Sequence, residues 1–233
     1  RSPATRARRT SGAGRRRRPQ HDAVDHRETA LVDHLPRVRL FGASRRGRSH
    51  GWAGSWREDA FRLSAGSAPR SWWLLAVADG AWSRSLSRVG ARLAVSAASR
   101  FVTERIDVAL RDPSLLLLMA ARAAVAEILL EAAWRGTTEA DLASTLLLLL
   151  CADTEVATVH SYQIGDGLIA AFGAGGSVRT LGAPDGEIYA GTTRFLASDA
   201  AFEPARARRH ELETPPRGFV VATDGVADDL VPL

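Results

Sequence analysis

The chain has 233 residues, of which 45% are apolar and 24% are charged, and it contains one cysteine. This length and composition are typical of a single large globular domain with a substantial core. One cysteine excludes disulfide frameworks within the chain and cysteine-rich zinc sites. No stretch of the sequence reaches the roughly 18 to 20 apolar residues that a membrane span requires. We therefore expect a cytoplasmic protein.

The formal net charge of +5 is unevenly distributed along the chain. Residues 1–18 hold eight of the 31 basic residues and no acidic residue, which leaves a net charge of −3 on the remainder. This segment has almost no apolar content, so we predict a disordered basic tail and linker over residues 1–36 and a folded domain over residues 37–233. Because no aromatic residue interleaves with the arginines, nucleic-acid binding is a minor alternative.

The first half of the domain combines strands with two long helices. Strands are expected within residues 36–47, 57–64 and 71–78, and the last of these is a buried apolar run that ends at Asp79-Gly80. Apolar residues from Leu86 to Val108 recur every three or four positions, which predicts a helix. A second helix, over residues 114–134, follows Asp112-Pro113.

The second half is a series of short β-like runs separated by Gly, Asp or Pro. They are residues 144–152, 155–164, 167–173, 177–182, 193–198, 207–213 and 218–223. The five leucines at 146–150 are also compatible with a buried helix, although the length of the run and the β-branched Thr145 favour a strand. Strands at this spacing, with a helix pair between two groups, predict a layered α+β sandwich of antiparallel sheets.

Acidic residues recur where these strands begin or end: Glu58-Asp59, Asp79, Asp166 and Asp224. An Asp-Gly pair is also an ordinary turn former, so each position alone is compatible with a turn and no further role. Carboxylate oxygens are the ligands that magnesium and manganese prefer, whereas the lack of paired His or Cys argues against zinc. Together these acids are suited to a binuclear site with oxygen ligands.

Taken in order, these stretches resemble the metal-dependent protein serine/threonine phosphatases, the type 2C or PPM family, and in particular its bacterial branch. The resemblance covers about residues 38–233, and its specificity lies in the ordered set of motifs, not in any one of them. The matching stretches are GRSH (47–50), REDAF (57–61), AVADGAWS (76–83), GARLAV (90–95), STLLLLL (144–150), YQIGDGLIAAF (162–172) and VVATDGVADDL (220–230).

The resemblance implies a four-layer αββα sandwich, two mainly antiparallel sheets flanked by helices, and a site for two Mn²⁺ or Mg²⁺ ions. In it, Asp79 would bridge the two ions, the Gly80 carbonyl and Glu58 would complete one side, and Asp224 would bind the other ion. Asp59 would orient metal-bound water.

Further roles follow from the same resemblance. Asp166 corresponds to a family acid near the metal centre, or it only holds a β-turn. His50 is a candidate to protonate the leaving group or to bind phosphate, although an exposed loop histidine usually does neither. Arg46 or Arg48 is a candidate to contact phosphate. The implied reaction is direct hydrolysis of phosphoserine or phosphothreonine by a metal-activated water, without a phospho-enzyme.

Three departures from the family pattern bear on activity. The family usually supplies another metal-ligating Asp beyond the second Asp-Gly, whereas this chain ends nine residues after Asp224, which suggests a C-terminally truncated domain. Gly54 and Ser55 occupy the region where a phosphate-binding arginine is expected. Trp82 replaces a glycine and is expected to narrow or block the site.

The sequence thus leaves two functions open. The leading prediction is a phosphoprotein phosphatase, whose partners are phosphoprotein substrates and a cognate serine/threonine kinase. The alternative is a catalytically weak phosphatase-like domain that binds a phosphoprotein or a partner kinase. A metal-ligating Asp-Asn pair further along a longer gene would favour the enzyme.

Overall fold

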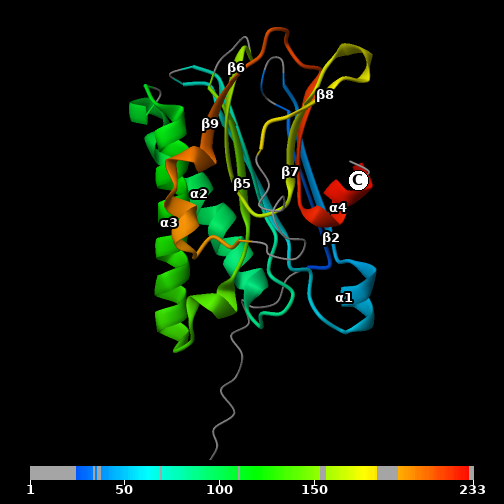
Figure 1. Ribbon diagram of the computed structural model, residues 1–233, viewed down its shortest axis with the longest axis vertical. Helices are drawn as coiled ribbons and strands as arrows, with labels where there is room; N and C mark the ends of the chain where they lie inside the picture. The colour runs from blue at the N-terminus through cyan, green and yellow to red at the C-terminus, as the bar shows by residue number, and fades with distance from the viewer. Residues whose placement is uncertain are drawn as a thin grey trace, which may run out of the picture.

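The computed structural model describes residues 25–33, 35, 38–68, 70–109, 111–152, 156–182 and 194–230. The basic run predicted to be disordered, residues 1–18, lies outside these ranges. Two long helices, α2 (Ser87–Ala109) and α3 (Pro113–Arg135), pack together and cover one face of a five-stranded antiparallel sheet (Figure 1). The order of that sheet is β3 (Ala60–Gly66), β4 (Trp72–Ala78), β5 (Leu146–Cys151), β6 (Thr158–Ile164) and β9 (Ala207–Glu211).

Local sequence explains where α3 begins and ends. The carboxylate of Asp112 accepts a hydrogen bond from the Leu115 N–H at 3.0 Å, and Pro113 occupies the first helical position, where it has no N–H to lose. Gly136 ends the helix with φ of +65°, a left-handed conformation that glycine adopts without strain. The predicted span of 114–134 is confirmed.

The five-leucine run is strand β5, and it is buried on both faces. Because side chains alternate along a strand, Leu146, Leu148 and Leu150 pack in the core shared with the helices. Leu147 and Leu149 point the other way, into a second core that contains residues of another sheet layer. This central position explains why the run shows no apolar–polar alternation.

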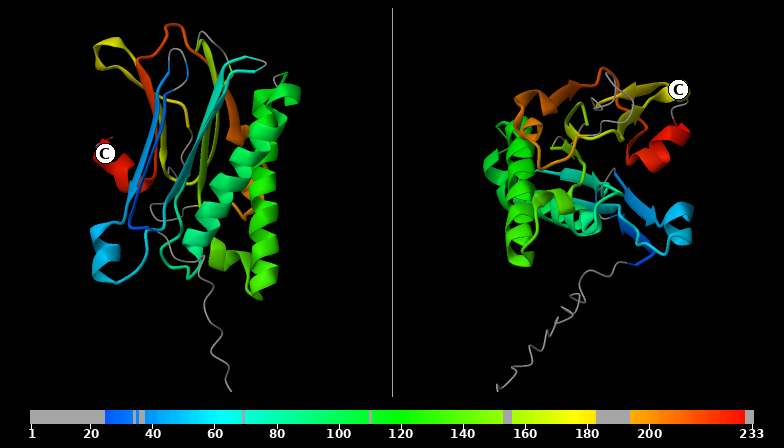
Figure 2. Two further views of the ribbon diagram at one scale, coloured as in Figure 1. Left: turned by 180° about the vertical axis from the view of Figure 1, so that it is seen from behind. Right: turned by 60° about the horizontal axis from the view of Figure 1, so that its bottom comes forward.

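The second layer consists of two sheets. One has the order β10 (Gly218–Ala222), β7 (Leu168–Phe172) and β8 (Val178–Thr180); the other pairs β1 (Arg27–Val32) with β2 (Leu40–Arg45). Short helix α4 (Asp224–Leu230) contacts β10 on the side away from α2 and α3 (Figure 2), and α1 (Arg48–Trp52) follows β2. The predicted α+β class, with antiparallel sheets flanked by helices, is confirmed.

Two local predictions are wrong. Residues 27–32, which we assigned to a linker, form β1 and pair with β2 from Arg27↔Arg45 to Val32↔Leu40, so the folded domain begins before residue 37. Within the predicted strand 193–198, residues 194–198 contain no strand but lead through a turn into the 3₁₀ helix η4 (Asp199–Phe202). No helix in the described ranges is long and apolar enough to cross a membrane.

Candidate metal-binding site

The register of β3 and β4 brings the first acidic stretch against the second. Ala60 pairs with Ala78 at the end of this antiparallel ladder. Continued beyond that pair, the register sets Asp59 opposite Asp79 after one step and Glu58 opposite Gly80 after two. A hydrogen bond joins the side chains of Asp59 and Asp79.

The second layer also has acidic residues just beyond the end of an antiparallel ladder. In the β7–β10 ladder, the last pair is Leu168↔Ala222. Asp166 lies two residues before Leu168 and Asp224 lies two residues after Ala222, at the same end of the ladder. Both of these carboxylates act electrostatically on Asp79, which belongs to the other sheet. The structure therefore brings four of the predicted acids, from both sheets, to one end of the sandwich.

Asp79 is the electrostatic centre of this cluster. Burial, like-charge repulsion from Asp59, Asp224 and Asp166, and the hydrogen bond with Asp59 together raise the pKa of its carboxyl to about 9, with burial the largest cause. At neutral pH these carboxyl groups cannot all be ionised at low cost unless positive charge joins them. The cluster thus has the property expected of a site for a multiply charged cation.

The backbone of Asp79 is fixed by the start of β5. Its N–H donates to Thr145 Oγ1 at 2.8 Å, and its carbonyl accepts from the Thr145 N–H, also at 2.8 Å. Gly80 forms an isolated β-bridge with Ser144. A Cβ at Gly80 would lie 2.8 Å from the backbone carbonyl carbon of Ser87, so the first turn of α2 requires glycine there.

Glu58 offers an acceptor to the same region. Burial raises the pKa of its carboxyl, while His50, a hydrogen bond from the Ser87 hydroxyl and Arg88 act in the opposite direction. Its Oε2 is buried and has no hydrogen-bond partner among the residues that the structure describes. A buried carboxylate oxygen without a partner is costly unless something binds it.

The side chains nevertheless do not form a complete ligand set. Among the residues that the structure describes, no three His, Cys, Asp or Glu side chains converge closely enough to hold a metal ion. The donors that are present, carboxylates and the Gly80 carbonyl, are hard oxygen ligands of the kind that Mg²⁺ and Mn²⁺ bind together with water. The residues therefore fit such a cation, with water or further backbone ligands completing its coordination.

His50 and Arg46 lie beside this site, in and next to α1. His50 Nδ1 shares a hydrogen bond with Ser55 Oγ at 3.0 Å, and the Arg46 guanidinium donates to the Ser55 carbonyl at 3.2 Å. The His50 ring lies 5.9 Å from the Trp82 ring, centroid to centroid. Trp82 is 73% exposed, so it lies at the rim and does not fill the acidic site.

Two buried arginines next to the acids were not identified from the sequence. Arg88, in the first turn of α2, donates to the Ser85 carbonyl at 2.8 Å and lies over the Trp56 ring. Arg57 is 4% exposed; it forms an ion pair with Glu28 at 2.6 Å and donates to the Asp25 carbonyl at 3.0 Å. In a chain with many arginines, no local pattern distinguishes these two from solvated ones.

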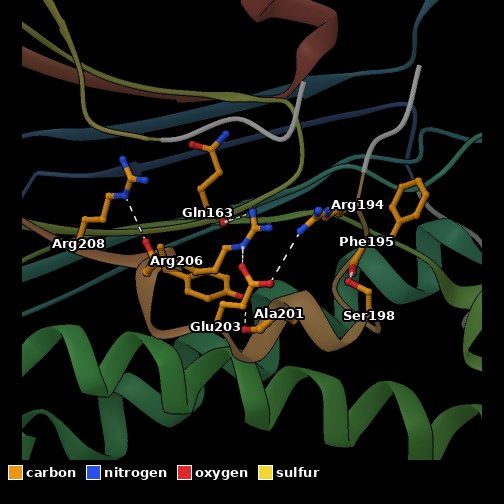
Figure 3. Close-up of polar contacts among 10 residues, drawn as sticks. Gln163, Arg194, Phe195, Ser198, Ala201, Glu203, Arg206 and Arg208 are labelled. Carbon is orange, nitrogen blue, oxygen red and sulfur yellow. Dashed lines mark hydrogen bonds and ion pairs between the residues drawn. The ribbon is translucent and has the colours of Figure 1, made fainter. Parts of the chain in front are cut away.

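Polar contacts hold the segment that precedes β9, and Figure 3 shows several of them. Tyr162 donates its hydroxyl hydrogen to the Ala201 carbonyl at 2.9 Å, and Arg206 pairs with Glu203 at 3.7 Å. The N–H of Leu196 donates to the Ser144 carbonyl at 2.8 Å. Since Ser144 is bridged to Gly80, the Leu196 contact links this segment to the strand end that carries Asp79.

Comparisons with known proteins agree with this fold. The family model described as protein phosphatase 2C matches residues 46–233. No curated protein matches the chain. The structure is similar to that of the S. agalactiae serine/threonine phosphatase, with 14% identity, a TM-score of 0.58, and coverage of 88% of this chain and 82% of that chain.

Two structures of a bacterial serine phosphatase, each with a different single arginine substitution, are similar as well. One has 12% identity and a TM-score of 0.56, and covers 75% of this chain and 72% of that chain. The other has 13% identity and a TM-score of 0.55, with coverage of 73% and 71%. At such identities the structures establish the fold, while the match over residues 46–233 establishes the family. The chain belongs to the protein phosphatase 2C family of protein serine/threonine phosphatases.

Proposed function

We propose that this domain hydrolyses phosphoserine and phosphothreonine in proteins with two divalent cations, Mn²⁺ or Mg²⁺, bound at the acidic end of the sandwich. The observation that carries the proposal is that carboxylates from both sheets, Asp59, Asp166 and Asp224, all act on Asp79. We assign Asp79, Glu58, Asp224 and the Gly80 carbonyl as metal ligands. Bound cations would supply an activated water and would offset charge on the phosphate.

The protein's own side chains have distinct tasks in this reaction. The water oxygen attacks phosphorus, the bond from phosphorus to the seryl or threonyl oxygen breaks, and that oxygen takes up a proton. Asp59, hydrogen-bonded to Asp79, orients the water, and Asp166 adds negative charge that favours cation binding. His50 is the proposed proton donor to the leaving oxygen, because its Nδ1 contact with Ser55 fixes the ring beside the site. Arg46 is proposed to contact the phosphate.

The partners in this proposal are phosphoproteins and the serine/threonine kinase that phosphorylates them. We propose the reducing cytoplasm as the compartment, because the single cysteine, Cys151, cannot form a disulfide within the chain and is buried in β5.

The test is hydrolysis of para-nitrophenyl phosphate and of a phosphothreonine peptide, with Mn²⁺ and with a chelator. Wild type should turn over only with the cation. Asp79→Asn should lose at least about 100-fold in kcat/KM, since it removes the carboxylate on which Asp59, Asp166 and Asp224 all act. Arg62→Ala, an exposed change on β3, is the matched control and should retain activity. Equal activity with and without cation would contradict the proposal.

A second candidate is a phosphatase-like domain that binds a phosphoprotein or a partner kinase with little turnover. The lack of a converged three-side-chain ligand set in the described residues favours it. Calorimetric titration of Mn²⁺ separates the two. Cation binding together with turnover supports the enzyme, whereas retention of a phosphopeptide without turnover supports the binding module.

A further inference from the structure

A second polar site lies at the other end of the five-stranded sheet. A cavity of about 380 Å³ opens there between the β3–β4 turn, the α2–α3 connection and the ends of β6 and β9. In Figure 1, α2 ends and α3 begins at the upper end of the helix pair, whereas α2 begins at the lower end. The length of β4 separates this cavity from Asp79 by roughly 20 Å, at about 3.3 Å per residue.

Three arginines from three separate segments line the cavity: Arg70 before β4, Arg111 before α3, and Arg209 on β9. Arg209 pairs with Glu211 at 3.1 Å. Within the described ranges, no acidic side chain forms an ion pair with Arg70 or Arg111. The wall also contains Asp112, whose Oδ1 already accepts the Leu115 N–H. The excess of positive charge around one cavity favours an anionic ligand.

A buried histidine contributes a second, independent feature. His160 lines the same cavity and is only 7% exposed, and its Nδ1 shares a hydrogen bond with Ser114 Oγ at 2.9 Å. Its Nε2 has no hydrogen-bond partner among the described residues. If the serine hydroxyl donates to Nδ1, the neutral ring carries its proton on Nε2 and can donate it to a ligand.

The surroundings keep His160 neutral. Burial, as the largest cause, together with Arg209 and His210 on β9 lowers the pKa of the ring to about 4, while Asp112 acts in the opposite direction. The cavity therefore presents cationic guanidinium forks together with a neutral ring, an arrangement in which a multiply charged oxyanion satisfies several donors at once. A carboxylate can be satisfied by a single fork, whereas a phosphate has oxygens for three.

We propose that this cavity binds a phosphate group through Arg70, Arg111, Arg209 and the Nε2 of His160. The ligand is a phosphate monoester or free phosphate, and the phosphoryl chemistry is the same for a phosphorylated side chain. The site is separate from the acidic cluster, and its existence does not depend on the catalytic proposal above.

The experiment is calorimetric titration of the whole chain after treatment with a chelator, so that no cation bridges phosphate to the carboxylates. The probes are inorganic phosphate, a phosphoserine peptide and the same peptide without phosphate. Wild type should bind both phosphorylated probes and not the plain peptide. Arg70→Ala/Arg111→Ala should weaken binding at least tenfold, about the loss expected from removing two charge-assisted contacts. Arg62→Ala removes one exposed arginine elsewhere and should leave binding unchanged.

Two further arms locate the ligand and its source. Phosphate should shift the His160 ring resonances in wild type but not in the double variant, with His160→Gln identifying the signal. A peptide that binds at least tenfold more tightly than inorganic phosphate indicates a phosphorylated protein as the ligand, and equal affinities indicate a free phosphate. Asp79→Asn should bind as wild type does, which separates this site from the catalytic one. Undiminished phosphate binding in the double variant, or no binding in wild type, would overturn the proposal.

Discussion

Asp79 stands where two requirements conflict. The proposed function requires a carboxylate among carboxylates, whereas folding opposes burying like charges together, and this opposition raises the pKa of Asp79 to about 9. An acid whose pKa is raised in the folded state keeps its proton when folded and loses it when unfolded. Between the unfolded value of 3.8 and about pH 9, this residue therefore makes the folded state less stable as pH rises.

We accordingly predict that Asp79→Asn stabilises the protein while it abolishes activity. In the presence of a chelator, the free energy of unfolding of wild type should fall from pH 5 to pH 8 relative to that of the variant, because an amide does not ionise. Urea titrations at the two pH values measure the difference. A variant that is less stable than wild type at pH 8 would show that Asp79 is not held among like charges.

Trp82 lies at the rim of the acidic site, exposed and beside His50. A rim aromatic offers contact area to residues that flank a phosphoserine but cannot reach a small phosphoester. For Trp82→Ala we predict a KM several-fold higher for a phosphopeptide and unchanged kinetics with para-nitrophenyl phosphate. Trp134→Ala, an exposed tryptophan on α3, serves as the control. A loss that is equal on both substrates would place Trp82 in the catalytic machinery.

At the residue scale, the sequence was informative where chemistry and strand ends coincide. Asp59, Asp79, Asp166 and Asp224 could be located because each follows or precedes an apolar run, and the observed registers bring them together. Arg57 could not, because its burial depends on Glu28 and on the Asp25 carbonyl of a strand region that we had assigned to a linker.

At the scale of elements, α3 and β6 are joined by a polar contact in the wall of the arginine-lined cavity. His160 on β6 reaches Ser114 in the first turn of α3, and the neutral form of the ring is required there because the pKa is lowered to about 4. The unfolded chain binds a proton near the ordinary value of 6.5, whereas the folded chain does not. Stability is therefore lost as pH falls from about 6.5 toward 4.

We predict that His160→Gln reduces this acid sensitivity. Between pH 7 and pH 5, the urea midpoint of wild type should fall more than that of the variant, since glutamine keeps a polar contact but takes up no proton. His210, whose pKa is also lowered by burial, leaves part of the dependence in place. His26→Gln is the control, and parallel pH profiles in wild type and His160→Gln would contradict the prediction.

Helices and strands could be predicted from the sequence where their apolar residues recur with a regular period. The helices and β4 have strong apolar patterns, and both were placed to within a few residues. β1 was missed because its side chains are mostly exposed, so its sequence has no alternation to detect. Residues 194–198 looked like a strand, but Leu196 alone is buried and serves as the anchor of a turn.

At the scale of the molecule, Arg57 ties the β1–β2 sheet to the strand that carries the acidic pair. Removing Glu28 leaves the buried Arg57 charge without its partner, although Glu28 itself is partly exposed. We predict that Glu28→Gln lowers the free energy of unfolding by about 1–2 kcal/mol, a value reduced from that of a fully buried pair. Glu104→Gln, from the exposed pair with Arg105, should have almost no effect. Denaturant titration tests both, and equal losses would contradict the structural role of Arg57.

The division of the acids between two sheets also determines when the site can arise during folding. Asp59 and Asp79 are 20 residues apart in sequence and are joined by one hairpin-like pairing, whereas Asp224 is 145 residues from Asp79. Contacts of such separation form late, because a long loop must be closed before they contribute any favourable energy. Each sheet can form while the carboxylates of the other sheet are still distant. Repulsion between Asp79 and the carboxylates of the second layer therefore arises only when the two layers dock. Docking of the layers should therefore be the folding step whose rate responds most strongly to ionic strength and to divalent cations.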